Sequence, residues 1–140
     1  MGNTARVTVE HPAGSDLQVS ARFESGARMG LDSHSGEWGA SPVEALLGAL
    51  GACAAMDVIS ILRKKRQEVT AYEVVVEGDR RSEHPRIFIR IEVVHRLRGR
   101  DLQPAAVQEA IHLSDIKYCT VHALLGGVAE IVSRFEIAPD

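Results

Sequence analysis

The feature that most constrains the fold is a run of apolar and small residues over positions 43–62. Ser41 and Pro42 precede it, and Glu44 stands three residues after the serine, which is the pattern of a helix that begins with a capping box. The basic residues 63–66 follow, where their charge opposes the negative end of a helix dipole. We therefore predict one helix from Ser41 to about Arg66.

This predicted helix is apolar on nearly every side. Small residues inside it permit close approach by neighbouring elements: Gly48, Ala49, Gly51, Ala52, Ala54 and Ala55. One modest sheet covers only one side of such a helix, so a second layer is needed, and a partner subunit could supply it. The run is also long enough to cross a bilayer, but Asp57 would be costly at that depth. We expect a core helix and no membrane.

The rest of the chain reads as alternating short elements in one α+β domain over residues 1–140. The order is ββ(β)–α–ββ–α–α–β, with the strands packed around the long buried helix. Strands are predicted over 5–10, 16–23, 27–32, 70–81, 86–97 and 130–137, a loop over 32–39, and short helices over 103–112 and within 115–126. In the strand over 86–97, we expect Ile87, Ile89, Ile91 and Val93 to share one face.

Composition excludes several function classes. The formal charge of −3 and the even mixing of acids and bases provide no field for a polyanion, so we expect no nucleic-acid partner. The first residues do not resemble a signal sequence. Two cysteines in 140 residues then indicate a reducing compartment, and we expect a cytoplasmic protein with free, catalytic or metal-bound thiols.

The two cysteines are the main candidates for chemistry. Cys53 lies in the middle of the long helix, where no free amide lowers its pKa, and a buried structural thiol is the alternative. Cys119 stands near the start of a short helix and two residues from Lys117, a setting that favours the thiolate. It too could be a structural cysteine.

The stretches SPVEALLGALGACAAMD and LSDIKYCTV together resemble the OsmC/Ohr family of organic hydroperoxide reductases, and most closely its YhfA-like branch. The resemblance covers nearly the whole chain. It implies an OsmC-like fold and an intertwined homodimer whose sites lie at the subunit interface. This expectation agrees with a helix that is apolar all round.

The resemblance also implies a peroxidase cycle without a cofactor. Cys53 would attack a small organic hydroperoxide and become a sulfenic acid, which Cys119 would resolve as a disulfide. A dithiol reductant, lipoyl-linked in the best-known members, would restore both thiols. The alternatives are a dimeric redox-sensing or ligand-binding protein with little turnover, and a binding module whose cysteines are purely structural.

In the family's peroxidases, an Arg from the N-terminal strands activates the thiolate, and a Glu directly after the Pro holds that Arg. Val43 occupies this position here, and Glu44 comes one residue later. Nine residues of helix place Glu44 and Cys53 on opposite sides, so the capping box explains Glu44 better. Arg6 and Arg22 are the candidates for the Arg, with a surface salt bridge as the alternative.

A metal site is the last alternative. Asp57 lies one helical turn after Cys53 and would raise the thiol's pKa unless it is paired with a cation or hydrogen-bonded. A cluster of Cys53, Cys119 and one of the nearby histidines, His112 or His122, could bind zinc. Because the spacing matches no metal-binding pattern, we predict no metal.

Overall fold

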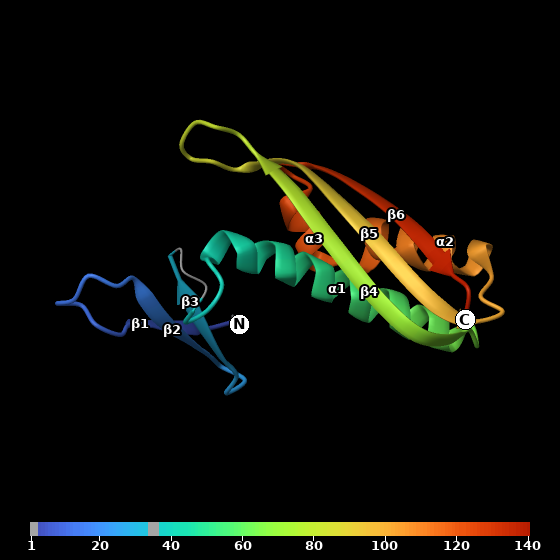
Figure 1. Cartoon of the computed structure of the whole chain (residues 1–140), viewed down its shortest axis with the longest axis horizontal. Coiled ribbons are helices and arrows are strands. Elements are labelled where there is room, and N and C mark those ends of the chain that lie inside the picture. Colours follow the sequence, from blue (N-terminus) through green and yellow to red (C-terminus); the bar gives the residue numbers. More distant parts are fainter. Residues whose placement is uncertain (1–2, 34–36) are drawn as a thin grey trace. The chain divides into compact units, whose positions relative to one another are not determined.

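The computed structural model describes residues 3–33 and 37–140, which form two compact units. The predicted loop over 32–39 lies partly outside these residues. The first unit, residues 1–46, contains an antiparallel sheet with strand order β1-β2-β3 (Figure 1). Its strands are β1 (Ala5–Val9), β2 (Gln18–Phe23) and β3 (Arg28–Asp32), as predicted. The prediction of one domain over residues 1–140 stays a prediction.

The second unit, residues 47–140, contains a three-stranded sheet with order β4-β5-β6. Strands β4 (Glu68–Arg80) and β5 (Phe88–Arg100) form the predicted hairpin, and β6 (Glu130–Ala138) lies parallel to β5. Two parallel neighbouring strands must be joined by a crossover connection. Helices α2 (Pro104–Leu113) and α3 (Thr120–Leu125) provide it, together with the π-helical turn η1 (Ser114–Tyr118) between them.

Helix α1 (Pro42–Lys64) begins as the sequence indicates. The Glu44 amide donates to Ser41 Oγ at 3.1 Å, and the Ser41 amide donates to Glu44 Oε1 at 3.0 Å, so the capping box is confirmed. The helix ends before Arg66, which takes a left-handed φ of 58°. The Gln67 amide then bonds the carbonyl of Leu62, which caps the last turn.

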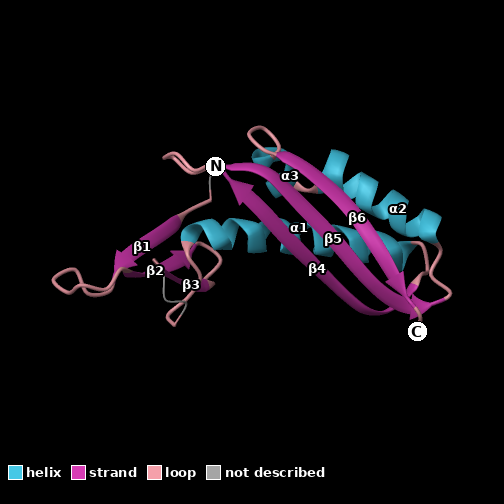
Figure 2. Cartoon of the chain, turned by 45° about the horizontal axis from the view of Figure 1, so that its top comes forward, coloured by secondary structure: helices cyan, strands magenta, loops and turns pink. Residues whose placement is uncertain are grey.

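Within the second unit, α1 and α2 cover the same face of the β4-β5-β6 sheet (Figure 2). Five residues of α1 are buried: Leu50, Gly51, Ala54, Val58 and Leu62. A Cβ on Gly51 would lie 3.0 Å from Val76 Cγ2, so the glycine permits close approach to β4. The core continues through Leu97, Val107 and Ile111.

The opposite side of α1 is exposed in the single chain. Met56 is 70% exposed and Leu46 44%, with the small residues Ala49 and Ala52 between them. The helix is therefore buried along one stripe only, as expected of a helix that one sheet covers. It is long and apolar enough to cross a membrane, and 28% of its most apolar stretch is buried within the chain. The expectation of a core helix and no membrane stays a prediction.

One detail of β5 contradicts the predicted alternation. Ile91 and Val93 are buried, whereas Ile89 is 51% exposed and Phe88 is buried in place of Ile87. The reason is a β-bulge, because Arg80 pairs with Phe88 and Asp79 with Arg90, which leaves Ile89 without a partner. Because of the extra residue, the side chains that face the core before the bulge have the opposite parity to those after it.

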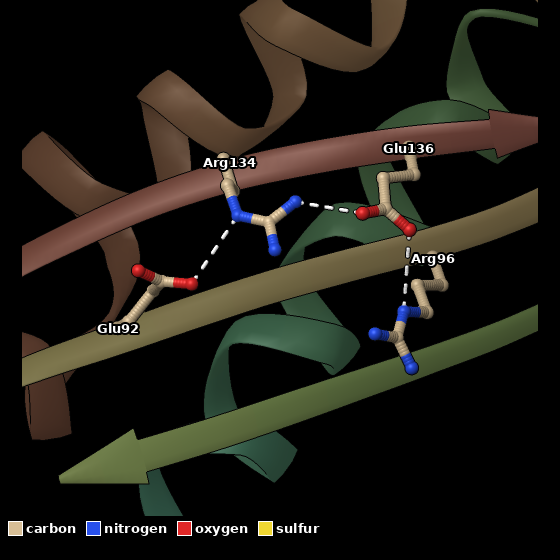
Figure 3. Close-up of polar contacts among 4 residues, drawn as sticks. All are labelled: Glu92, Arg96, Arg134 and Glu136. Atoms are coloured by element: carbon tan, nitrogen blue, oxygen red, sulfur yellow. Dashed lines mark hydrogen bonds and ion pairs between the residues drawn. The ribbon is translucent and has the colours of Figure 1, made fainter.

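The other face of this sheet carries alternating charges across β5 and β6 (Figure 3). Arg134 donates to Glu92 at 3.2 Å and to Glu136 at 2.7 Å, and Arg96 donates to Glu136 at 3.3 Å. The bond from Arg134 holds the pKa of Glu136 below its usual value. Charges this exposed contribute little to stability individually, but they keep this face polar.

His95 is a fully buried polar residue in the second unit. Its Nδ1 lies 2.6 Å from the hydroxyl of Tyr72, and its Nε2 has no partner among the described residues. Burial lowers the pKa of His95 to about 4, because the charged imidazole would lose its hydration.

This burial predicts an acid-sensitive core. The pKa of His95 is about 6.5 in the unfolded chain and about 4 in the folded protein, so between these pH values the unfolded chain binds more protons. The free energy of unfolding is therefore highest above this pH range and falls as the pH is lowered through it. The loss is about 3 kcal/mol. Urea unfolding of the wild type and of His95→Gln at several pH values measures it. Equal pH dependence of both proteins would contradict the prediction.

Candidate functional site

The two cysteines lie together in the second unit, as the sequence predicted. Cys53 comes from the middle of α1, and Cys119 stands between η1 and α3. Their sulfur atoms and one carboxylate oxygen of Asp57 all lie within 4.8 Å of one another. Both thiols are free, and Cys53 is the more exposed of the two. The site therefore contains two thiols and an acid at close range.

Cys119 is the N-cap residue of α3. Its φ of −78° and ψ of 102° are extended, and its Sγ accepts a hydrogen bond of 3.4 Å from the His122 amide. The prediction that it stands at the start of a helix is confirmed. The expectation that its setting favours the thiolate is wrong, because burial raises the pKa of Cys119 to about 12, and its hydrogen bond with Cys53 adds to the shift. The ammonium of Lys117 lies over the Tyr118 ring instead.

Ser114 connects the two helices that carry the thiols. Its hydroxyl donates to Asp57 Oδ2 at 3.0 Å, and its carbonyl accepts from the Cys119 amide at 2.9 Å. The second bond spans five residues, which is the spacing of a π-helix. Ser114 is fully buried, so it fixes both Asp57 and the backbone of Cys119. Asp57 is thus hydrogen-bonded, which is one of the two conditions predicted from the sequence for an acid beside Cys53.

The sequence did not reveal Ser114. It stands in the stretch LSDIKYCTV, but in an ordinary α-helix its carbonyl would accept from the amide of residue 118 instead of residue 119. The only available signal was a small polar residue between apolar neighbours, five positions before a cysteine. Such a residue is too common to single out.

Among the described residues, neither His112 nor His122 belongs to the cluster of Cys53, Cys119 and Asp57, so the zinc alternative with a histidine ligand is not found. His122 Nε2 lies 3.8 Å from Asp115 Oδ1, and this carboxylate is itself partly buried. Burial raises the pKa of Asp115, and Ser133, His122 and His112 oppose this rise only in part. Asp57, which the sequence pattern did not offer as a ligand, takes the place of a histidine beside the two sulfurs.

The predicted arginines belong to the first unit. Arg6 lies directly opposite Arg22 on the neighbouring strand, and Arg22 lies opposite Arg28, so three guanidinium groups cross the sheet in a row. They line a hollow of about 600 Å³ together with Trp38. Within the described ranges, 3–33 and 37–140, no salt bridge or hydrogen bond holds any of them, so the surface salt bridge is not found. Roles for Arg6, Arg22 and Glu44 in catalysis stay predictions.

The burial of Cys119 predicts selective labelling. Iodoacetamide at neutral pH should modify Cys53 and leave Cys119 largely unmodified, because the reagent reacts with exposed thiolates. The labelling rate of Cys119 should rise about tenfold per pH unit from about pH 7 to 10, since the thiolate fraction grows tenfold per unit below the pKa. Peptide mass spectrometry measures both sites. A plateau near the pKa of an ordinary thiol would contradict the assignment.

The sequence of this chain is similar to those of known proteins. The model of the family described as OsmC-like protein matches residues 33–133. Protein YhfA of Escherichia coli K12 is 42% identical over 113 residues, which cover 81% of this chain and 84% of the relative.

Solved structures repeat the fold. A hypothetical protein from Aquifex aeolicus is 27% identical, with a TM-score of 0.87 over 100% of this chain and 98% of the other. The organic hydroperoxide resistance protein OhrB of Bacillus subtilis is 16% identical, with a TM-score of 0.61 over 95% and 98% of the two chains.

Proposed function

The chain belongs to the OsmC-like protein family, and from this premise we propose that it reduces organic hydroperoxides with Cys53 and Cys119. The observation that carries the proposal is the approach of the two sulfur atoms to within 4.8 Å in a reduced, unbonded state. A relative of the same fold is named an organic hydroperoxide resistance protein. The same fold therefore occurs in a protein whose name refers to organic hydroperoxides.

In this proposal, Cys53 is the thiol that reacts with the peroxide. It is more exposed than Cys119, whose raised pKa keeps it protonated at neutral pH. The Cys53 thiolate attacks the terminal peroxide oxygen, the O–O bond breaks, and the alkoxide takes a proton to leave as an alcohol. Cys53 becomes a sulfenic acid.

Cys119 completes the cycle as the resolving thiol. Its sulfur attacks the sulfenic sulfur, a disulfide forms, and the hydroxyl leaves as water with the thiol proton. Cys53 is held within a helix of 23 residues, so the shorter helical segments on either side of Cys119 make the adjustment. An external dithiol then reduces the disulfide and is itself oxidised.

The family resemblance implies that an Arg activates Cys53, and we propose Arg22 or Arg6 for this role. Among the described residues, no salt bridge or hydrogen bond holds either guanidinium group, and Glu10 lines the same hollow. Glu44 does not need to hold the Arg, since its carboxylate already accepts the bond that caps α1. The row of three arginines across the first sheet offers the most concentrated positive charge in that unit.

The test is the thiol count of the reduced protein after one equivalent of an alkyl hydroperoxide and a rapid quench. We expect the loss of two thiols per chain, with an intramolecular disulfide visible in the intact mass. Cys53→Ser should abolish peroxide consumption, and Cys119→Ser should stop at the sulfenic acid, which dimedone traps. Consumption that survives Cys53→Ser would remove the proposal.

A redox sensor is the second candidate, and the high pKa of Cys119 favours it. A protonated resolving thiol slows disulfide closure, which suits a protein that changes oxidation state as a signal. Val43, where the family's peroxidases have a Glu, points the same way. Sustained turnover with a dithiol donor would exclude the sensor, and a single slow oxidation would support it.

We further propose that a second copy of this chain covers the exposed side of α1. The small residues Gly48, Ala49 and Ala52 on that side permit two helices to approach closely, and Met56 adds an apolar side chain that is 70% exposed. An intertwined homodimer would supply the layer that the chain's own sheet leaves open.

Met56→Lys tests the homodimer. A charge at the centre of an apolar helix contact should convert the dimer into monomers, as measured by light scattering after size exclusion. Val128→Lys is the matched control, because Val128 is 62% exposed and lies in a turn outside α1. A wild-type chain that is monomeric at all concentrations would contradict the proposal.

A further inference from the structure

The cluster of two thiols and Asp57 has the geometry of a metal site. Tetrahedral Zn²⁺ with two sulfur ligands and one oxygen ligand holds its donors about 3.6–3.8 Å apart. The sulfurs of Cys53 and Cys119 and a carboxylate oxygen of Asp57 lie within 4.8 Å of one another. Small side-chain adjustments would bring all three atoms around one ion.

Residues outside the cluster hold two of the three donors in place. Ser114 Oγ donates to Asp57 Oδ2, which orients the carboxylate. The His122 amide donates to Cys119 Sγ, a bond that stabilises a metal-bound thiolate. Ser114 is fully buried and therefore cannot turn away to solvent. Metal ligands in proteins are commonly supported by such hydrogen bonds.

The donor set selects the kind of metal. Thiolates bind borderline and soft ions, whereas Mg²⁺ and Ca²⁺ require oxygen ligands, so a site with two sulfurs favours Zn²⁺. Three protein ligands leave a fourth position for water. The three anionic donors would also lose their mutual repulsion once a divalent cation stands between them.

We propose that Cys53, Asp57 and Cys119 bind one Zn²⁺ ion in the reduced protein. Zinc binding does not depend on the proposed peroxidase activity, because it requires only that both thiols are reduced. It has a consequence for the peroxidase all the same, since zinc occupies both sulfurs and a disulfide between them cannot bind it. Zinc therefore protects the reduced pair.

The experiment uses Co²⁺ as a visible substitute for Zn²⁺ with the full chain, reduced and desalted without oxygen. We expect one Co²⁺ per chain, a thiolate-to-cobalt charge-transfer band, the visible bands of a four-coordinate ion, and displacement by Zn²⁺ but not by Mg²⁺. Cys53→Ser and Cys119→Ser should each lose the charge-transfer intensity of one sulfur and most of the affinity.

Two further variants test the carboxylate and its support. Asp57→Asn should weaken binding by about tenfold or more, and Ser114→Ala by about tenfold, the effect usual for a supporting hydrogen bond. Asp79→Asn, an exposed position on β4, is the matched control for the change in charge and should leave the affinity unchanged. If Asp57→Asn fails to fold, Ser114→Ala still tests the same carboxylate.

Two results would overturn the proposal. One is the absence of a cobalt spectrum when both thiols are shown to be reduced, and the other is an Asp57→Asn affinity equal to that of the wild type. Peroxide consumption is measured separately on chelator-treated protein. A failure of the zinc site is thereby distinguished from a failure of the peroxidase.

Discussion

The packing of α1 against β4 is the constraint on which the site depends. Gly51 lets the helix approach Val76 closely, and this contact fixes the rotation of the helix about its axis. With Leu50, Val58 and Leu62 facing the core, Cys53 and Asp57 lie at the side of the buried stripe, where residues after α2 can reach them. A helix turned by a third of a turn would separate the two thiols. The packing of α1 on the sheet thus places Cys53 and Asp57 near Cys119.

Much of this arrangement was predictable from local sequence patterns. The capping box at Ser41 and Glu44 and the hairpin of β4 and β5 follow from short-range rules. The bulge at Ile89 does not, because a run of alternating isoleucines fits a regular strand equally well. Bulges depend on the partner strand, which a single segment does not encode.

The candidate site was predictable in its residues and not in its electrostatics. The resemblance identified Cys53 and Cys119, and their proximity is confirmed. The pKa of Cys119 could not be predicted from Lys117 and the helix start. The effect of burial on the thiol is larger than theirs, and burial depends on the tertiary fold. Ser114 was missed for a related reason, because its role requires the five-residue turn that only the structure reveals.

The parallel pairing of β5 with β6 has a consequence for the order of folding. Cys119 lies within the crossover between these strands, so we expect its position to become fixed only when β6 pairs with β5. During synthesis the α1 thiol emerges well before its partner, and the contacts that unite them are among those most distant in sequence. We therefore expect the two thiols to come together late in folding, after β6 has paired with β5.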